Sequence, residues 1–133
     1  MVIDSSALVA ILFDEPERHR FDTLIQADRV RLISAATLVE ISIVIDSRKR
    51  DAGVRELDLF LNRAGVETIP VTPEQAQLAR RAYRDFGKGR HPARLNFGDC
   101  FAYALAKITG EPLLCKGVEF AKTDLHLADK ETS

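Results

Sequence analysis

The sequence predicts an α/β fold with a central, mostly parallel sheet of four or five strands and helices on both faces. Short apolar segments alternate along the chain with longer segments whose apolar residues recur at helical spacing. Glycine, proline and capping residues separate these segments. The 133 residues, of which 46% are hydrophobic, suit one domain with a sizeable core, so we expect a single domain over residues 1–133.

In the first half of the chain, a buried strand ends at Asp4, and Ser5 and Ser6 offer caps for the helix that follows. Glu15 and Pro16 start a second helix. Thr37 and Glu40 stand at capping-box spacing, and three cations suit the negative end of the helix at 48–50. The expected elements are strand 1–4, helix 7–13, helix 15–27, strand 31–34, helix 35–48 and helix 53–64.

In the second half, Gly65 ends a helix and Pro70 lies at the end of a strand. Thr72 and Pro73 start a helix that turns Tyr83, among others, to the core. Asn96 caps a last helix, which Gly110 ends. The expected elements are strand 66–71, helix 72–86, helix 97–108 and strand 112–115.

Asp99 lies in the first turn of a helix that is apolar on nearly all sides. Such a helix belongs in the interior of a domain, and a buried carboxylate there needs a partner. Either the helix N-terminus satisfies Asp99, or the carboxylate holds a cation.

Two further acids allow the same two interpretations. Asp4 stands where a strand ends and a helix begins, the edge at which α/β sheets bind ligands, but it can also be a cap. Glu40 is the one charged residue of an apolar helical segment, so it either completes a capping box with Thr37 or has a buried partner. Glu119 and Asp124 follow the last strand, at the same kind of edge.

Carboxylates in this number favour Mg²⁺ or Mn²⁺, because these ions prefer oxygen ligands and because like charges could not pack together without a cation. Such an ion activates water for attack on a phosphate. The loop before Asp99 carries Lys88, Arg90 and Arg94, which predict either phosphate binding or a solvated surface; Arg80 and Arg84 could extend it, and Arg48, Lys49 and Arg50 form an alternative group.

Composition limits the remaining choices. The net charge of −1 gives no general affinity for nucleic acid, so binding must come from local basic patches. Cys100 and Cys115 have no metal-binding spacing, and no segment has the pattern of a signal peptide or a membrane helix. We therefore expect a cytoplasmic protein with reduced thiols and no membrane association.

The chain resembles the PIN-domain ribonucleases, and among them the VapC toxins of bacterial VapBC toxin–antitoxin pairs. The resemblance covers essentially the whole chain and rests on Val2-Ile3-Asp4-Ser5-Ser6-Ala7, the helix with Glu40, Leu95-Asn96-Phe97-Gly98-Asp99-Cys100, and Lys116-Gly117-x-x-Phe120-x-x-Thr123-Asp124. It implies a PIN-like three-layer α/β/α domain. It also implies a Mg²⁺-dependent endoribonuclease toxin, with Mn²⁺ as a substitute, that cleaves structured RNA such as tRNA or rRNA.

The resemblance also implies roles for individual acids. Asp4 and Asp99 match the principal metal ligands, and Glu40 matches a third acid that acts through water. For the fourth acid, we favour Asp124 over Glu119, because related sequences have Asp where this chain has Glu119.

The implied partners are an RNA substrate, a cognate VapB-type antitoxin that inhibits the toxin, and a second copy in a homodimer or a toxin–antitoxin hetero-oligomer. Two alternatives remain open: a catalytically idle PIN-fold domain that binds RNA or sequesters an antitoxin, and a nuclease that acts on DNA.

Overall fold

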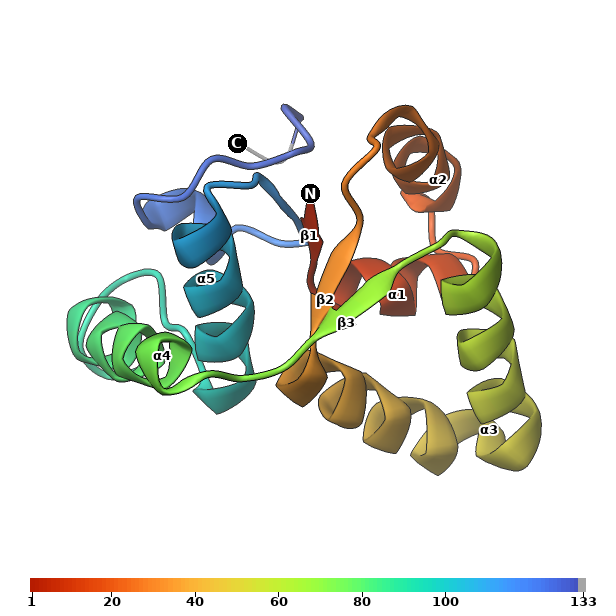
Figure 1. Ribbon diagram of the computed structural model, residues 1–133, viewed down its shortest axis with the longest axis horizontal. Helices are drawn as coiled ribbons and strands as arrows, with labels where there is room; N and C mark the ends of the chain where they lie inside the picture. The colour runs from red at the N-terminus through yellow and green to blue at the C-terminus, as the bar shows by residue number, and fades with distance from the viewer. Residues whose placement is uncertain (132–133) are drawn as a thin grey trace.

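The computed structural model describes residues 1–131 and has the expected α/β architecture, with helices on both sides of a small sheet (Figure 1). Its elements are β1 (Val2–Ile3), α1 (Ser5–Leu12), α2 (Arg18–Ala27), β2 (Leu32–Ser34), α3 (Ala35–Arg63), β3 (Glu67–Ile69), α4 (Pro73–Phe86), α5 (Phe97–Thr109), β4 (Leu113–Leu114) and the 3₁₀ helix η1 (Phe120–Lys122).

The four strands form one sheet in the order β3-β2-β1-β4, and every neighbouring pair is parallel. Val2 of β1 lies opposite Leu32 of β2 on one side and Leu113 of β4 on the other. The prediction of a parallel sheet of four or five strands is therefore confirmed. Because the strands are parallel, their carboxyl ends meet at one edge, at the bottom of Figure 1, where α3 begins.

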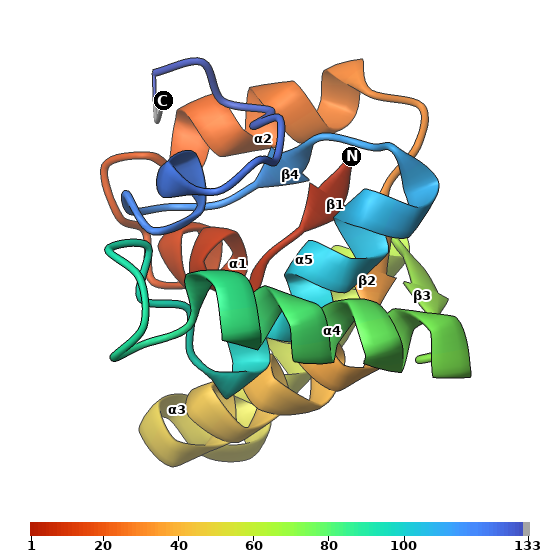
Figure 2. The same cartoon turned by 90° about the vertical axis from the view of Figure 1, so that its left-hand side faces the viewer.

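Alternation along the strands divides the core into two layers. Val2 and Leu113 belong to the cluster beneath α4 and α5, whereas Ile3 and Leu114 belong to the cluster with α1, α2 and α3. All four side chains are fully buried. Figure 2 shows α4 lying across the outside of α5, so α5 is enclosed between α4 and the sheet, which explains why it is apolar all round.

Several expectations for the first half of the chain differ from the structure in detail, among them the start of α2, which is Arg18 and not Glu15. The cap of α1 is Asp4, whose side chain accepts a hydrogen bond from the amide of Ser6, so the serines lie inside the helix. Helix α3 is capped by Ser34, which excludes a capping box of Thr37 and Glu40. The two expected helices 35–48 and 53–64 are joined across a kink at Arg50, which has a positive φ of 56°.

The inner face of α4 includes Ala79 and Phe86 as expected but does not include Tyr83. Gln75, Ala79 and Ala82 are buried, whereas Tyr83 is 41% exposed. The small residues allow α4 to approach α5 closely, and the large ring of Tyr83 lies at the margin of that contact.

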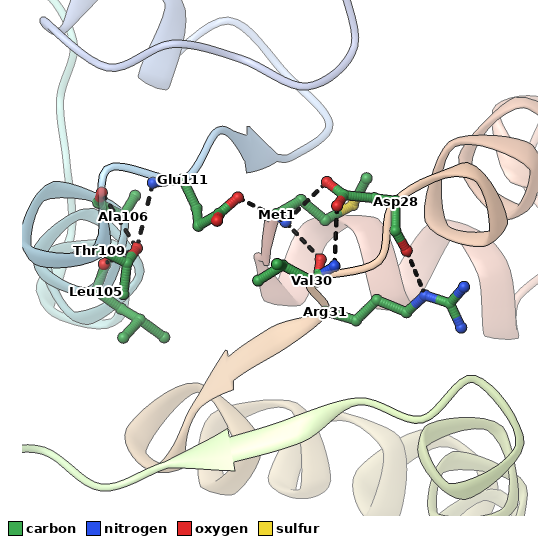
Figure 3. A network of polar contacts seen from close by, with 8 residues as sticks. All are labelled: Met1, Asp28, Val30, Arg31, Leu105, Ala106, Thr109 and Glu111. Carbon is green, nitrogen blue, oxygen red and sulfur yellow. Dashed lines mark hydrogen bonds and ion pairs between the residues drawn. The ribbon is translucent and has the colours of Figure 1, made fainter.

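Polar contacts fix the amino end of the sheet, opposite the edge where α3 begins (Figure 3). The ammonium group of Met1 donates hydrogen bonds to Asp28 at 2.9 Å, to the carbonyl oxygen of Val30 at 2.6 Å and to Glu111 at 3.2 Å. These contacts tie β1 to the segments that lead into β2 and β4, and thereby hold the register of the sheet.

Candidate active site

Four acids from separate segments converge at the carboxyl edge of the sheet. Asp4 follows β1, Glu40 lies in the first turns of α3, Asp99 lies in the first turn of α5, and Glu119 precedes η1 after β4. Burial raises the pKa of Asp99, and the negative charges of the other three acids add to this effect, so each of them lies within electrostatic range of Asp99.

Asp4 is held rigidly at the centre of this edge. It is 3% exposed, and its Oδ2 accepts hydrogen bonds from the amide of Ser6 at 3.0 Å and from the hydroxyl of Ser6 at 2.6 Å. The same hydroxyl accepts a hydrogen bond from the amide of Lys116 at 2.9 Å, so Ser6 ties Asp4 to the loop after β4. The other oxygen, Oδ1, is buried and has no donor among the described residues.

Burial raises the pKa of Asp4; the hydrogen bonds from Ser6 and Ser5 partly offset this, and the charge of Glu119 adds to it. A buried carboxylate with one unpaired oxygen and a raised pKa is costly to maintain unless a cation neutralises it.

Asp99 confirms the first of its two interpretations, because it helps to cap the start of α5, while a role in holding a cation stays a prediction. It forms a capping box with Asn96, in which Oδ2 of Asp99 accepts from the amide of Asn96 and the side chain of Asn96 accepts from the amide of Asp99, each at 2.9 Å. Nevertheless burial raises the pKa of Asp99 to about 7, with the charges of Asp4, Glu40 and Glu119 adding to the effect and the Asn96 amide opposing it. None of the described residues donates a hydrogen bond to Oδ1, which leaves this oxygen free for a ligand.

The carboxylate of Glu40 lies directly against Gly98 in the first turn of α5. Burial raises the pKa of Glu40; a hydrogen bond from the Ser5 side chain opposes the rise, and the charge of Asp4 adds to it. Glu40 therefore joins the same group of acids from the neighbouring helix.

The structure separates the two candidates for the fourth acid. Glu119 acts electrostatically on Asp4 and Asp99, and also on the buried thiol of Cys115, whose pKa is raised first by burial and then by these acids. A Cβ on Gly117, which has a positive φ of 105°, would lie 2.5 Å from Oε2 of Glu119, so the loop turns tightly around this side chain.

Asp124 is instead engaged by α5. It accepts a hydrogen bond from the hydroxyl of Tyr103 at 2.7 Å and pairs with Lys107 at 2.8 Å. Partial burial works to raise the pKa of Asp124, but these two partners outweigh it and hold the pKa below its usual range. The structure therefore does not bring Asp124 to the other acids, and our choice of fourth acid moves to Glu119.

The donor set fits a hard divalent cation. Among residues 1–131, no three His, Cys, Asp or Glu side chains form a complete metal-ligand group as they stand. Asp4 and Asp99, however, each have an oxygen without a donor, and Mg²⁺ is commonly held by one or two carboxylates and several waters. Both cysteines are free and buried, with pKa values raised by burial, and so are poor metal ligands.

The cationic loop before α5 has a fixed backbone and exposed charges. Its ends are held by Lys88 and Leu95, since the amide of Lys88 donates to the carbonyl of Leu95 at 2.8 Å, and Ala93 and Leu95 are fully buried. Lys88, Arg90 and Arg94 are exposed, and none of them forms an ion pair within the described part of the chain. The loop thus presents three cations immediately before Asn96 and Asp99.

The alternative group of cations is partly occupied by other contacts. Lys49 donates a hydrogen bond to the carbonyl of Leu12 at 2.9 Å and pairs with Glu56 at 3.3 Å, and Arg48 lies over the ring of Phe13. These contacts tie the middle of α3 to the end of α1, so Arg48 and Lys49 have a structural role.

Sequence reasoning did not identify Ser6 as more than a helix cap. Its hydroxyl selects which oxygen of Asp4 stays free, because it occupies Oδ2 and leaves Oδ1 without a donor. The one signal in the sequence is a serine two residues after an acid at the end of a strand.

Comparison with known proteins shows which family the chain is similar to. The PIN domain family matches residues 1–125. The chain is 55% identical over 125 residues to Ribonuclease VapC30 of Mycobacterium tuberculosis, which covers 94% of this chain and 95% of the relative. No helix in the described part of the chain has the length and hydropathy needed to cross a bilayer.

Solved structures show the same fold at much lower identity. VapC20 of Mycobacterium tuberculosis, described as a sarcin–ricin loop cleaving toxin, has a TM-score of 0.75 and 16% identity over 93% of this chain and 95% of its own. VapBC2 from Rickettsia felis, bound to a DNA fragment from its promoter, has a TM-score of 0.75 and 16% identity over 95% of both chains. With its parallel sheet, its acids at the carboxyl edge and its close sequence relatives, the chain belongs to the PIN-domain family and, within it, to the VapC ribonucleases, the toxins of toxin–antitoxin systems.

Proposed function

We propose that this VapC ribonuclease is a Mg²⁺-dependent endonuclease that cleaves structured RNA, such as tRNA or rRNA, within a single PIN domain over residues 1–133. The observation that carries the proposal is the pair of carboxylates Asp4 and Asp99, which come from distant segments and each keep one oxygen without a donor among the described residues. Burial raises the pKa of Asp99, and the charge of Asp4 adds to this effect. Mn²⁺ is expected to substitute for Mg²⁺.

Each acid has a distinct part in this proposal. Asp4 and Asp99 would hold the ion, Glu40 would act through a water molecule, and Glu119 would complete the group from the loop after β4. When bound, a divalent ion lowers the pKa of water and neutralises charge on the phosphate under attack. Ser6 orients Asp4 by occupying Oδ2, and the capping box orients Asp99 in the same way.

The direct test is to incubate the purified protein with total RNA, with and without Mg²⁺, and to map the ends that are produced. We expect cuts at defined positions that require the ion and that disappear in EDTA. Cleavage that is unaffected by EDTA would contradict a metal-dependent reaction, and the absence of any cleavage would favour the idle RNA-binding or antitoxin-sequestering alternative. A DNA substrate of matching sequence tests the remaining alternative.

The choice between Glu119 and Asp124 predicts opposite behaviour for two variants. We expect Glu119→Gln to weaken Mn²⁺ binding by about 10-fold or more, the scale of changes to groups that support a metal site. Asp124→Asn should leave Mn²⁺ affinity unchanged and lower the melting temperature, because it removes the partner of Lys107 and Tyr103. Calorimetric titration with Mn²⁺ and thermal unfolding measure the two effects; the reverse assignment of effects would return Asp124 to the site.

We further propose that Lys88, Arg90 and Arg94 bind the RNA backbone beside the acids. Phosphate contacts of this kind position a substrate more than they read its sequence. Replacing all three with Ala should weaken RNA binding. It should also reduce the slope of log K against log salt concentration by roughly 0.7 for each phosphate contact that is lost with single-stranded RNA. The cut sites should stay the same, and cleavage at saturating RNA should change less than binding.

A matched control removes the same charge elsewhere. Arg29, Arg55 and Arg63 are exposed cations that form no ion pair within the described residues, and they lie outside the acidic edge. Their triple Ala variant should keep the salt slope of the parent. Equal slopes for the parent and the loop variant would show that the loop is only a solvated surface, and the RNA path would then be sought along Arg48, Lys49 and Arg50.

The proposed protein partners are supported by family membership and by three exposed apolar side chains on α3 and α5. VapC toxins form complexes with VapB antitoxins, and we propose that a cognate VapB-type antitoxin inhibits this enzyme in the cytoplasm. We also propose a homodimer, either alone or within a toxin–antitoxin hetero-oligomer, through the exposed residues Val39, Ile43 and Phe97 on α3 and α5 (60%, 65% and 78% exposed). Sedimentation of the parent and of Ile43→Lys tests this surface, since the charge should shift the protein toward monomer.

A further inference from the structure

Gly98 stands at the contact between the first turn of α5 and the carboxylate of Glu40. A Cβ built on Gly98 would overlap Oε2 of Glu40 and would lie 2.5 Å from its Cδ and 2.8 Å from its Oε1. All three of the heavy atoms nearest to that Cβ belong to this one carboxylate. The carboxylate of Glu40 therefore occupies the space in which a side chain at position 98 would lie.

The backbone gives no other reason for glycine at this position. Gly98 is the second residue of α5, and its φ lies outside the positive region, unlike that of Gly65, Gly89, Gly110 and Gly117. Glycine is a poor helix former compared with alanine, so the position is costly for the helix. In return, the carboxylate of Glu40 lies against the amino end of α5, where the partial positive charge of the helix favours an anion.

We propose that Gly98 is a positioning residue that seats Glu40 beside Asp99, so that any side chain at position 98 displaces the Glu40 carboxylate from the group of acids. This inference rests on the proposed function, in which Glu40 is the third acid of the metal site. The proposal gives a positioning role to a residue that has no side chain. The close approach of α3 and α5 at Gly98 then determines where the carboxylate of Glu40 lies.

Gly98→Ala is the informative variant, because it adds one methyl group and no charge. The end of the Glu40 side chain is flexible and can move, and alanine suits the helix better, so we expect a melting temperature in EDTA equal to or above that of the parent. We expect Mn²⁺ affinity and RNA cleavage to fall by about 10- to 100-fold, the scale of losses from groups that orient a metal ligand. A variant that gains thermal stability and loses metal affinity has the opposite signature to one that merely damages the fold.

Coupling to Glu40 separates this mechanism from a general disturbance of α5. In a Glu40→Ala background there is no carboxylate to displace, so adding Gly98→Ala should change Mn²⁺ affinity and cleavage by less than about 2-fold. If Gly98→Ala instead strains the fold and lowers the melting temperature, adding Glu40→Ala should restore the melting temperature. The melting temperatures then measure the same coupling between the two positions. Glu40→Asp, one methylene shorter, should recover part of the metal affinity in the Gly98→Ala protein.

Additive effects of the two substitutions, in metal affinity and in melting temperature alike, would overturn the proposal. So would a Gly98→Ala protein with the Mn²⁺ affinity and cleavage rate of the parent. The proposed function fails separately, if the parent neither binds Mn²⁺ nor cleaves RNA in a metal-dependent way. The coupling between positions 98 and 40 remains measurable in that case, because thermal unfolding in EDTA depends on neither property.

Discussion

Asp99→Asn is expected to lower RNA cleavage at least about 100-fold, the scale for losing a key electrostatic group, while the protein stays folded. Asparagine has the shape of aspartate, and its side-chain oxygen can still accept the hydrogen bond from the amide of Asn96 that completes the capping box. The change therefore removes the charge and leaves the start of α5 in place. Cleavage rate, Mn²⁺ affinity and circular dichroism measured on the same preparation separate chemistry from folding.

The matched control is Asp58→Asn, which removes one exposed carboxylate from α3 outside the acidic edge. It should keep the cleavage rate and the Mn²⁺ affinity of the parent. If Asp99→Asn reduced the amount of folded protein but left the specific activity of the folded fraction unchanged, Asp99 would be a helix cap and nothing more.

The sequence determined the position of Asp99 and Asp4 well, because both depend on local signals. Asn96, Asp99 and Gly110 mark the ends of α5 through capping chemistry that is confined to a few residues, and the structure confirms each of them. The position of Asp4 could be predicted because the apolar strand before it must end before the next helix begins. The parallel sheet then brings the two together, since parallel strands share one carboxyl edge.

Contacts between distant segments were the part that could not be predicted from local signals. Asp124 and Glu119 have equivalent positions in the sequence, but only the folded loop shows that Tyr103 and Lys107 engage Asp124. Likewise, nothing near Gly98 in the sequence indicates that the carboxylate of Glu40, 58 residues earlier, occupies the space beside it. The exposed position of Tyr83 on α4 has the same origin, because close packing on α5 selects small residues over this large ring.

In the absence of metal, the contribution of Asp99 to the stability of the protein is expected to fall as pH rises toward 7. The folded state raises the pKa of Asp99 to about 7, whereas the unfolded chain has the ordinary value of 3.8. Between these two values the folded state binds more protons than the unfolded state, so the free energy of unfolding decreases with rising pH and levels off above about 7. This is the reverse of the usual behaviour of a carboxylate, whose pKa is more often lowered by folding.

Asp99→Asn removes this titration, so its melting temperature in EDTA should exceed that of the parent by a margin that grows from pH 5 to pH 7 and then stays constant. Because the carboxylate is partly exposed and screened by water, we expect about 1 kcal/mol, or roughly 3–6 °C for a domain of this size, rather than the full effect of the shift. Saturating Mn²⁺ should raise the melting temperature of the parent, most strongly at pH 8, and should raise that of Asp99→Asn much less, because an ion that binds only the folded state stabilises it. Parallel melting curves for the two proteins in EDTA from pH 5 to pH 8 would contradict a raised pKa at Asp99. A stabilisation by Mn²⁺ that is equal in both proteins would place the ion elsewhere.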